Sequence, residues 1–241
     1  MDIRVFDNMD DLTQSFTDWL AERLTEKEYL TISLSGGSTP KRLFDHWASL
    51  PQGEIDWTKI KFFWGDERCV PPENEESNYK MTKDHLFNFV SVPEKNIFRI
   101  QGENEVEAEA ERYATVLEQE LESKNGTPVF DIMMLGMGDD GHTASIFPHE
   151  IALWESNRNC VAATHPESGQ KRVSVTGKVI NAARHVVFLV TGENKAEKIG
   201  EIVRQPNKAE KKYPAALVQP DSGNLTWFMD NKAAKLLKSS V

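Results

Sequence analysis

Apolar residues recur along the chain with two spacings that alternate from one end to the other. Apolar positions three and four residues apart predict helices, and short continuous apolar runs predict buried strands. The predicted helices, the first of them capped by Asn8, span residues 9–24, 40–50, 106–121, 176–183, 194–204 and 230–238. The predicted strands span residues 30–34, 60–64, 132–135, 160–164, 186–191, 216–218 and 225–229.

This alternation is typical of an α/β fold, in which helices cover both faces of a mainly parallel sheet. No internal repeat, low-complexity tract or shift in composition marks a linker. We therefore expect one domain over residues 1–241. In such a sheet the loops after the strands lie at one edge, where ligands bind.

The loop after the strand 132–135 carries the strongest candidate chemistry. It reads Gly136-Met137-Gly138-Asp139-Asp140-Gly141-His142. Glycines allow a sharp turn at the end of a strand, and histidine is suited to moving a proton near neutral pH. The segment therefore predicts a catalytic base, His142, on a tight loop.

The same loop matches the dinucleotide fingerprint G-x-G-x-x-G, with Glu155 near the ribose-binding offset. That fingerprint requires a long helix whose N-terminus faces a pyrophosphate. Pro148 interrupts any helix soon after His142, and two acidic residues occupy the turn. We therefore do not expect a nicotinamide or flavin site.

Two further loops follow predicted strands. In Ser35-Gly36-Gly37-Ser38-Thr39-Pro40, the amides of Gly36 and Gly37 and the hydroxyls of Ser38 and Thr39 are suited to hold a phosphate at a helix N-terminus. An ordinary helix cap after a glycine turn is the alternative. The second loop, Gly65-Asp66-Glu67-Arg68, carries charges of both signs, which a surface ion pair also explains.

Composition narrows the chemistry further. The chain has a net charge of −10, which disfavours nucleic-acid binding and requires a locally basic pocket for any anionic ligand. Arg172 and Lys195 are candidate anion clamps, although either alone also suits a solvated charge. There are two cysteines, six histidines without metal-ligand spacing, and neither a membrane-length apolar run nor a signal segment. We expect a cytoplasmic protein that binds no membrane.

The loop motifs at 35–40, 64–68 with 77–79, and 136–145 continue in segments 172–176, 188–196 and 227–230. Taken in order over nearly the whole chain, they resemble the 6-phosphogluconolactonase family. The resemblance implies hydrolysis of 6-phospho-D-glucono-1,5-lactone in the oxidative pentose phosphate pathway, without a metal or organic cofactor. It implies the sugar-phosphate isomerase/deaminase fold of glucosamine-6-phosphate deaminase and ribose-5-phosphate isomerase, which is also CoA-transferase-like. We expect a monomer or weak homo-oligomer.

The residue chemistry agrees with that reaction, because a lactone ester needs an activated water and a site for the developing oxyanion. His142 is the expected base. Arg68 and loop amides are expected to stabilise charge, and Asp66 or Asp140 to orient the partners. The loop residues 36–39, with Arg172 and Lys195, are expected to hold the 6-phosphate.

Two alternatives remain at this point. An amino-sugar-phosphate deaminase of the same fold carries a glutamate one residue before the proline that follows its Gly-His motif, where this chain has Phe147. A non-catalytic sugar-phosphate sensor needs a basic helix-turn-helix, whereas residues 1–30 predict an amphipathic helix of an α/β domain.

Overall fold

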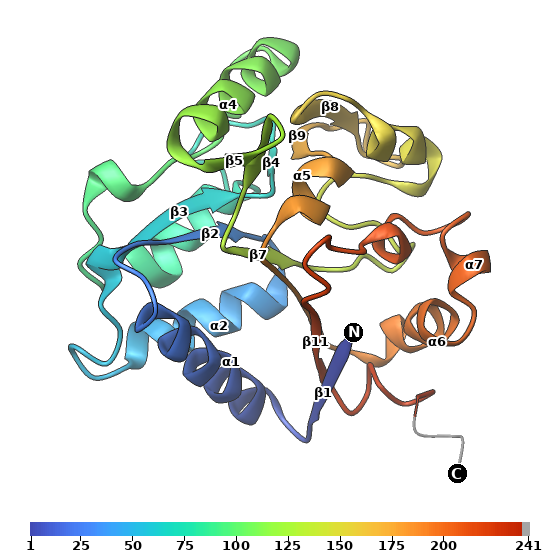
Figure 1. Ribbon diagram of the computed structural model, residues 1–241, viewed down its shortest axis with the longest axis horizontal. Coiled ribbons are helices and arrows are strands. Elements are labelled where there is room, and N and C mark those ends of the chain that lie inside the picture. The colour runs from blue at the N-terminus through green and yellow to red at the C-terminus, as the bar shows by residue number, and fades with distance from the viewer. Residues whose placement is uncertain (238–241) are drawn as a thin grey trace.

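A six-stranded sheet, parallel at every pairing, forms the centre of the computed structural model, which describes residues 1–237 (Figure 1). Across the sheet the strands are β1 (Asp2–Phe6), β11 (Leu225–Asp230), β10 (His185–Val190), β7 (Ile132–Leu135), β2 (Leu30–Leu34) and β3 (Ile60–Trp64). All six carboxyl ends therefore lie at one edge. The predicted α/β fold with a mainly parallel sheet is confirmed.

Neighbouring side chains of β11 show how helices cover the two faces of the sheet. Phe228 meets Phe16 of α1 (Met9–Leu24) edge-on, with 5.4 Å between the ring centroids. Trp227 points to the opposite face, as alternation along a strand requires, and lines a small cavity with Ile202 of α6 (Ala196–Arg204). α1 and α6 accordingly lie on opposite sides of the sheet (Figure 1).

A second, antiparallel sheet begins directly beyond β3. Its order is β4 (Asp66–Arg68), β9 (Lys171–Val175) and β8 (Cys160–Thr164). The Val175 N–H donates to the Gly65 carbonyl at 2.9 Å, which joins the small sheet to the carboxyl end of β3. This sheet therefore forms a wall beside the edge where the loops meet.

The other elements connect these two sheets. They are α2 (Ser38–Ser49), α3 (Asn78–Thr82), α4 (Val106–Glu120), α5 (Gly177–Ala182), α7 (Pro206–Ala209) and a hairpin of β5 (Glu122–Lys124) and β6 (Thr127–Val129). Helical segments of 3₁₀ or π type span Trp57–Lys59, Lys83–Phe87, Glu94–Asn96, Pro148–Glu155, Glu193–Lys195 and Pro214–Leu217. No helix in residues 1–237 combines the length and apolar composition of a membrane span.

Three predicted elements are wrong in whole or in part. Residues 216–218 are not a strand: Pro214–Leu217 is a 3₁₀ helix, and prolines at 214 and 220 cannot donate ladder hydrogen bonds. Residues 231–237 form turns rather than a helix, because β11 continues to Asp230, and Lys238 lies outside the described residues. Helix α2 begins at Ser38 rather than Pro40, so the proline is its third residue.

Candidate active site at the carboxyl edge of the sheet

A polar cavity of about 180 Å³ lies where the loops after β2, β3 and β7 converge. Its lining comprises Ser35, Gly36, Gly37, Asp66, Arg68, Asn78, Gly136, Met137, Gly138, His142, Ala144 and Arg172. The structure thus brings together six of the ten residues that the sequence suggested for the site. The other four, Ser38, Thr39, Asp140 and Lys195, lie outside this lining.

A tight turn presents His142 to the cavity. The Gly141 N–H donates to the Gly138 carbonyl at 3.0 Å, and the Gly138 N–H donates to the His142 carbonyl at 2.9 Å. A Cβ atom at position 138 would come within 2.2 Å of the imidazole, so only glycine fits there. No α-helix follows this loop before β8, as expected from Pro148, which argues against the dinucleotide interpretation.

Asp140 is the acid that pairs with His142. Its Oδ1 lies 2.7 Å from Nδ1 of His142 and accepts the His142 backbone N–H at 3.0 Å. Burial raises the pKa of Asp140, but these hydrogen bonds outweigh it and lower the pKa below its ordinary value. An ionised carboxylate only accepts, so in the neutral imidazole Nδ1 carries the proton and Nε2 presents a lone pair.

Aromatic packing and a constrained backbone surround His142. Phe147 is buried and packs on the imidazole, with ring centroids 4.6 Å apart, although it does not line the cavity. Ala144 adopts a φ of +47°, a conformation that costs energy for a residue other than glycine. Such strain is found where surrounding contacts fix a loop, and Ala144 lines the cavity beside His142.

Asp66 has a different role from Asp140. Its buried carboxylate accepts a hydrogen bond from the Ser145 hydroxyl at 2.6 Å, and Ser145 follows His142 by three residues. Through this hydrogen bond Asp66 connects β4 to the segment that follows His142, and Asp66 also lines the cavity.

Two arginines form one wall of the cavity. Arg68 and Arg172 lie directly opposite each other in the β4–β9 pairing. Each has a buried Nε without a hydrogen-bond partner in residues 1–237. Burial lowers the pKa of Arg172, and the nearby charge of Arg68 lowers it further. Two adjacent guanidinium groups with unused donors are suited to an anionic ligand.

The residues of the glycine loop, 36–39, line two different depressions. Gly36 and Gly37 line the catalytic cavity, and Gly37 precedes α2 with a φ of +105° and no side-chain cap. Ser38 and Thr39 line a neighbouring depression of about 420 Å³, where the hydroxyls of Thr39 and Thr191 lie 2.8 Å apart. The uncapped N-terminus of α2 thus lies between the two.

Lys195 does not face the cavity. Its ammonium pairs with Asp139, which also accepts a hydrogen bond from the Asn194 amide at 2.7 Å. Hydrogen bonding by Lys195 lowers the pKa of Asp139 below its ordinary value. Lys195 is therefore paired with Asp139, which precedes Asp140 by one residue and His142 by three.

Sequence reasoning did not select Asn78, which the structure places at the cavity. The Asn78 amide donates to the Asp66 carbonyl at 3.0 Å and lines the cavity. A Cβ atom at Gly36 would lie only 2.0 Å from Oδ1 of Asn78, so the glycine permits the close approach of the two loops. The only sign of this contact in the sequence is the polar pair Ser77-Asn78, which follows the turn that begins at Pro71-Pro72.

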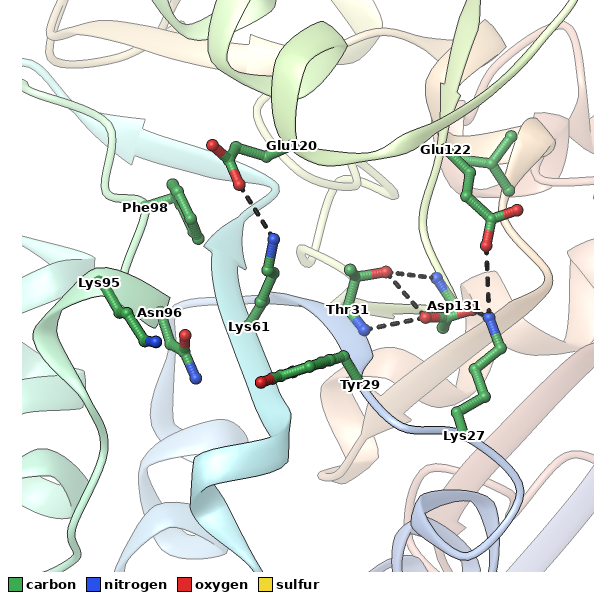
Figure 2. A pocket seen from close by; sticks show the side chains of 11 residues that line it. Lys27, Tyr29, Thr31, Lys61, Lys95, Asn96, Phe98, Glu120, Glu122 and Asp131 are labelled. Carbon is green, nitrogen blue, oxygen red and sulfur yellow. Dashed lines mark hydrogen bonds and ion pairs between the residues drawn. The ribbon is translucent and has the colours of Figure 1, made fainter.

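A larger depression, of about 530 Å³, lies at the opposite edge of the sheet (Figure 2). Figure 2 shows two ion pairs among its charged side chains, Lys61 with Glu120 and Lys27 with Asp131, whose N–O distances are 3.0 Å and 2.5 Å. It contains no histidine. Its carboxylates Glu120 and Asp131 are held by lysines, whereas the smaller cavity presents His142 beside two arginines. The smaller cavity is therefore the candidate active site.

The fold and this cavity define an α/β enzyme whose polar cavity, at the carboxyl edge of its sheet, is suited to a small anionic molecule. Residues 7–227 match the family model described as glucosamine-6-phosphate isomerases/6-phosphogluconolactonase, and the chain belongs to this family. It is 46% identical to the 6-phosphogluconolactonase of Haemophilus influenzae, over 86% of this chain and 87% of that one. It is 36% identical to the human 6-phosphogluconolactonase, over 98% of this chain and 93% of that one. A solved structure, that of devB protein, is 43% identical with a TM-score of 0.91 and covers 97% of this chain and 98% of its own.

Proposed function

We propose that this protein hydrolyses 6-phospho-D-glucono-1,5-lactone to 6-phospho-D-gluconate, the second step of the oxidative pentose phosphate pathway. The observation that carries the proposal is the His142–Asp140 pair at 2.7 Å, whose histidine lines a cavity walled by two arginines. We assign the activity to one domain over residues 1–241, acting as a monomer or weak homo-oligomer. A cytoplasmic location is part of the proposal and is supported by the two free thiols, Cys69 and Cys160.

The reaction follows from the histidine tautomer. Nε2 of His142 removes a proton from a water molecule as the water oxygen attacks the lactone carbonyl carbon. The carbonyl electron pair moves to the oxygen, where guanidinium groups and loop amides stabilise the negative charge. Collapse of this intermediate breaks the bond to the ring oxygen, which takes the proton back from His142. The product ionises as a carboxylate and releases one proton.

The chain's own groups suffice for these steps. In residues 1–237 no set of three His, Cys, Asp or Glu side chains is arranged to hold a metal ion. Asp140 stabilises the imidazolium, and Asp66 holds the loop through Ser145. Arg68, Arg172 and the amides of 36–39 are suited to the 6-phosphate and the oxyanion. Lys195 can bind the phosphate as well only if its ammonium leaves its ion pair with Asp139.

The direct test is a coupled assay on freshly generated phosphogluconolactone, corrected for its spontaneous hydrolysis. We expect rapid acid production by the wild type and a loss of at least about 10²–10⁴-fold in His142→Ala, as for a removed general base. A folded His142→Ala variant with near wild-type activity would make His142 structural.

The alternative deaminase reaction needs an acid/base group beyond the histidine, because protons move both at the ring oxygen and at carbon. Phe147, beside the imidazole, cannot carry one. We expect no ammonia from glucosamine 6-phosphate, even at high enzyme concentration. Ammonia release at a rate matching lactone hydrolysis would favour the deaminase.

The phosphate site has its own test. Arg172→Ala should weaken use of the phosphorylated lactone about ten- to a hundredfold, as for a lost charged hydrogen bond of ~1.5–3 kcal/mol, and affect unphosphorylated gluconolactone much less. Arg158→Ala, which removes a surface ion pair with Glu107, is the matched control and should change neither. Equal losses on both substrates in Arg172→Ala would rule out a phosphate role.

A further inference from the structure

Glu67 is a buried carboxylate that the proposed reaction leaves without a role. It lies between Asp66 and Arg68 in β4, so alternation along the strand turns it away from the cavity that its two neighbours line. Its exposed fraction is 2%. An ionised group is rarely buried to this extent unless it is fully hydrogen-bonded.

The carboxylate of Glu67 accepts four hydrogen bonds. Oε1 receives the backbone N–H groups of Arg68 and Asn78, both at 2.8 Å. Oε2 receives the Tyr79 N–H at 2.8 Å and the Ser77 hydroxyl at 3.1 Å. Three of these donors belong to the start of α3, so Glu67 fastens that helix to β4.

Both segments joined by Glu67 supply cavity wall. Asn78 reaches from α3 to the Asp66 carbonyl and lies against Gly36. Arg68 reaches from β4 in the other direction and donates to the Glu76 carbonyl. The two contacts depend on the same relative placement of β4 and the 76–79 segment, which the Glu67 hydrogen bonds fix.

We propose that Glu67 is a positioning residue of the active site: through its four hydrogen bonds it holds the Arg68 guanidinium and the Asn78 amide where the substrate binds. This inference rests on the proposed function for its kinetic readout. Glu67 touches no reacting atom and acts through these two side chains.

Glutamine cannot replace Glu67 in this arrangement. Both carboxylate oxygens accept from backbone N–H groups, so an NH₂ group in place of Oε1 would oppose two N–H groups, and in place of Oε2 it would oppose the Tyr79 N–H. Burial raises the pKa of Glu67, and the amides of Asn78, Tyr79 and Arg68 oppose that rise. The contacts themselves therefore require the negatively charged form.

Three variants test the proposal. Glu67→Gln replaces one of the two acceptor oxygens by an NH₂ group. Ser77→Ala leaves the carboxylate in place and removes one of its donors, together with the cap that the Ser77 hydroxyl provides to the Lys80 N–H at 3.1 Å. Glu109→Gln is the matched control: Glu109 is 1% exposed and binds Arg112 and the Gln101 N–H, but does not line the cavity. For each we would measure Tm, kcat and KM on the phosphorylated lactone, and amide hydrogen exchange over residues 66–82.

In Glu67→Gln we expect KM to rise about tenfold, equivalent to ~1.4 kcal/mol, with a much smaller change in kcat. Amide exchange over 66–82 should accelerate. Ser77→Ala should shift KM in the same direction by a smaller factor. Glu109→Gln should lower Tm and leave KM unchanged.

Two results would overturn the proposal: an unchanged KM in a folded Glu67→Gln, or an equal KM rise in Glu109→Gln at the same loss of Tm. If Glu67→Gln does not fold, an unchanged KM in Ser77→Ala would count against it in the same way. A wild type without lactonase activity would refute the proposed function instead. Hydrogen exchange would then still test Glu67, since unaltered exchange over 66–82 contradicts a positioning role.

Discussion

Replacing Asp140 with asparagine separates the charge of this residue from its geometry. One oxygen, Oδ1, accepts both the His142 backbone N–H at 3.0 Å and the Nδ1 proton at 2.7 Å. An amide oxygen can occupy the same place, so the turn and the histidine tautomer should persist. What is lost is the negative charge beside the imidazolium that forms when His142 takes a proton.

The size of the effect follows from the single charge-assisted bond. Such bonds are worth ~1.5–3 kcal/mol, which corresponds to about a 10- to 100-fold loss in kcat if the stabilisation applies only in the transition state. KM should change little, because the substrate itself does not contact Asp140 through this bond. Asp140→Ala should lose more, since it also removes the acceptor that fixes the tautomer.

The assay is the corrected lactone hydrolysis, followed at substrate concentrations that separate kcat from KM. The chain offers a matched control in Asp45→Asn, because Asp45 pairs with Nδ1 of His85 at 2.6 Å away from the cavity. That variant should keep wild-type kcat. A folded Asp140→Asn with kcat within about twofold of wild type would refute the role of the charge, since even the weakest such bond predicts about tenfold.

Further predictions concern other parts of the molecule. Burial raises the pKa of Cys69 to about 11 and that of Cys160 further, so neither thiol should react with Ellman's reagent at pH 7.5 until the protein is unfolded. Gly36→Ala should raise KM strongly, because the new methyl group would meet Oδ1 of Asn78; unchanged kinetics would show that the loops separate freely. EDTA should leave activity unchanged, and inhibition reversed by zinc would contradict a metal-free reaction.

The main sheet was largely predictable because its strands are short, continuous apolar runs. Strands β2, β3, β7 and β8 begin and end at the predicted residues. Strand β1 (Asp2–Phe6) was missed because it is half-buried at the edge of the sheet, with charged residues at positions 2 and 4. β4 was assigned to a charged loop, since only its pairing with β9 makes it a strand.

The site was predictable to the extent that strand ends determine it. Loops after parallel strands share one edge, so His142, Gly36 and Asp66 were expected together, and they line one cavity. Which polar groups pair could not be predicted, because it depends on side-chain directions. Asp139 and Asp140 are adjacent in the chain, yet one binds Lys195 and the other His142.

Because Asp139 binds Lys195 and its neighbour Asp140 binds His142, the candidate anion-binding lysine and the base are held by neighbouring acids of one short loop. Lys195 and His142 are each held by one of two consecutive carboxylates, and Lys195 opens the segment that leads into α6. If an arriving phosphate draws Lys195 away, Asp139, the neighbour of Asp140, keeps only the hydrogen bond from the Asn194 amide. In a chain with a net charge of −10, the unused donors of Arg68 and Arg172 then supply the attraction that an anionic substrate needs at the cavity. The local arrangement of these cations, rather than overall composition, is what suits this acidic protein to an anionic ligand.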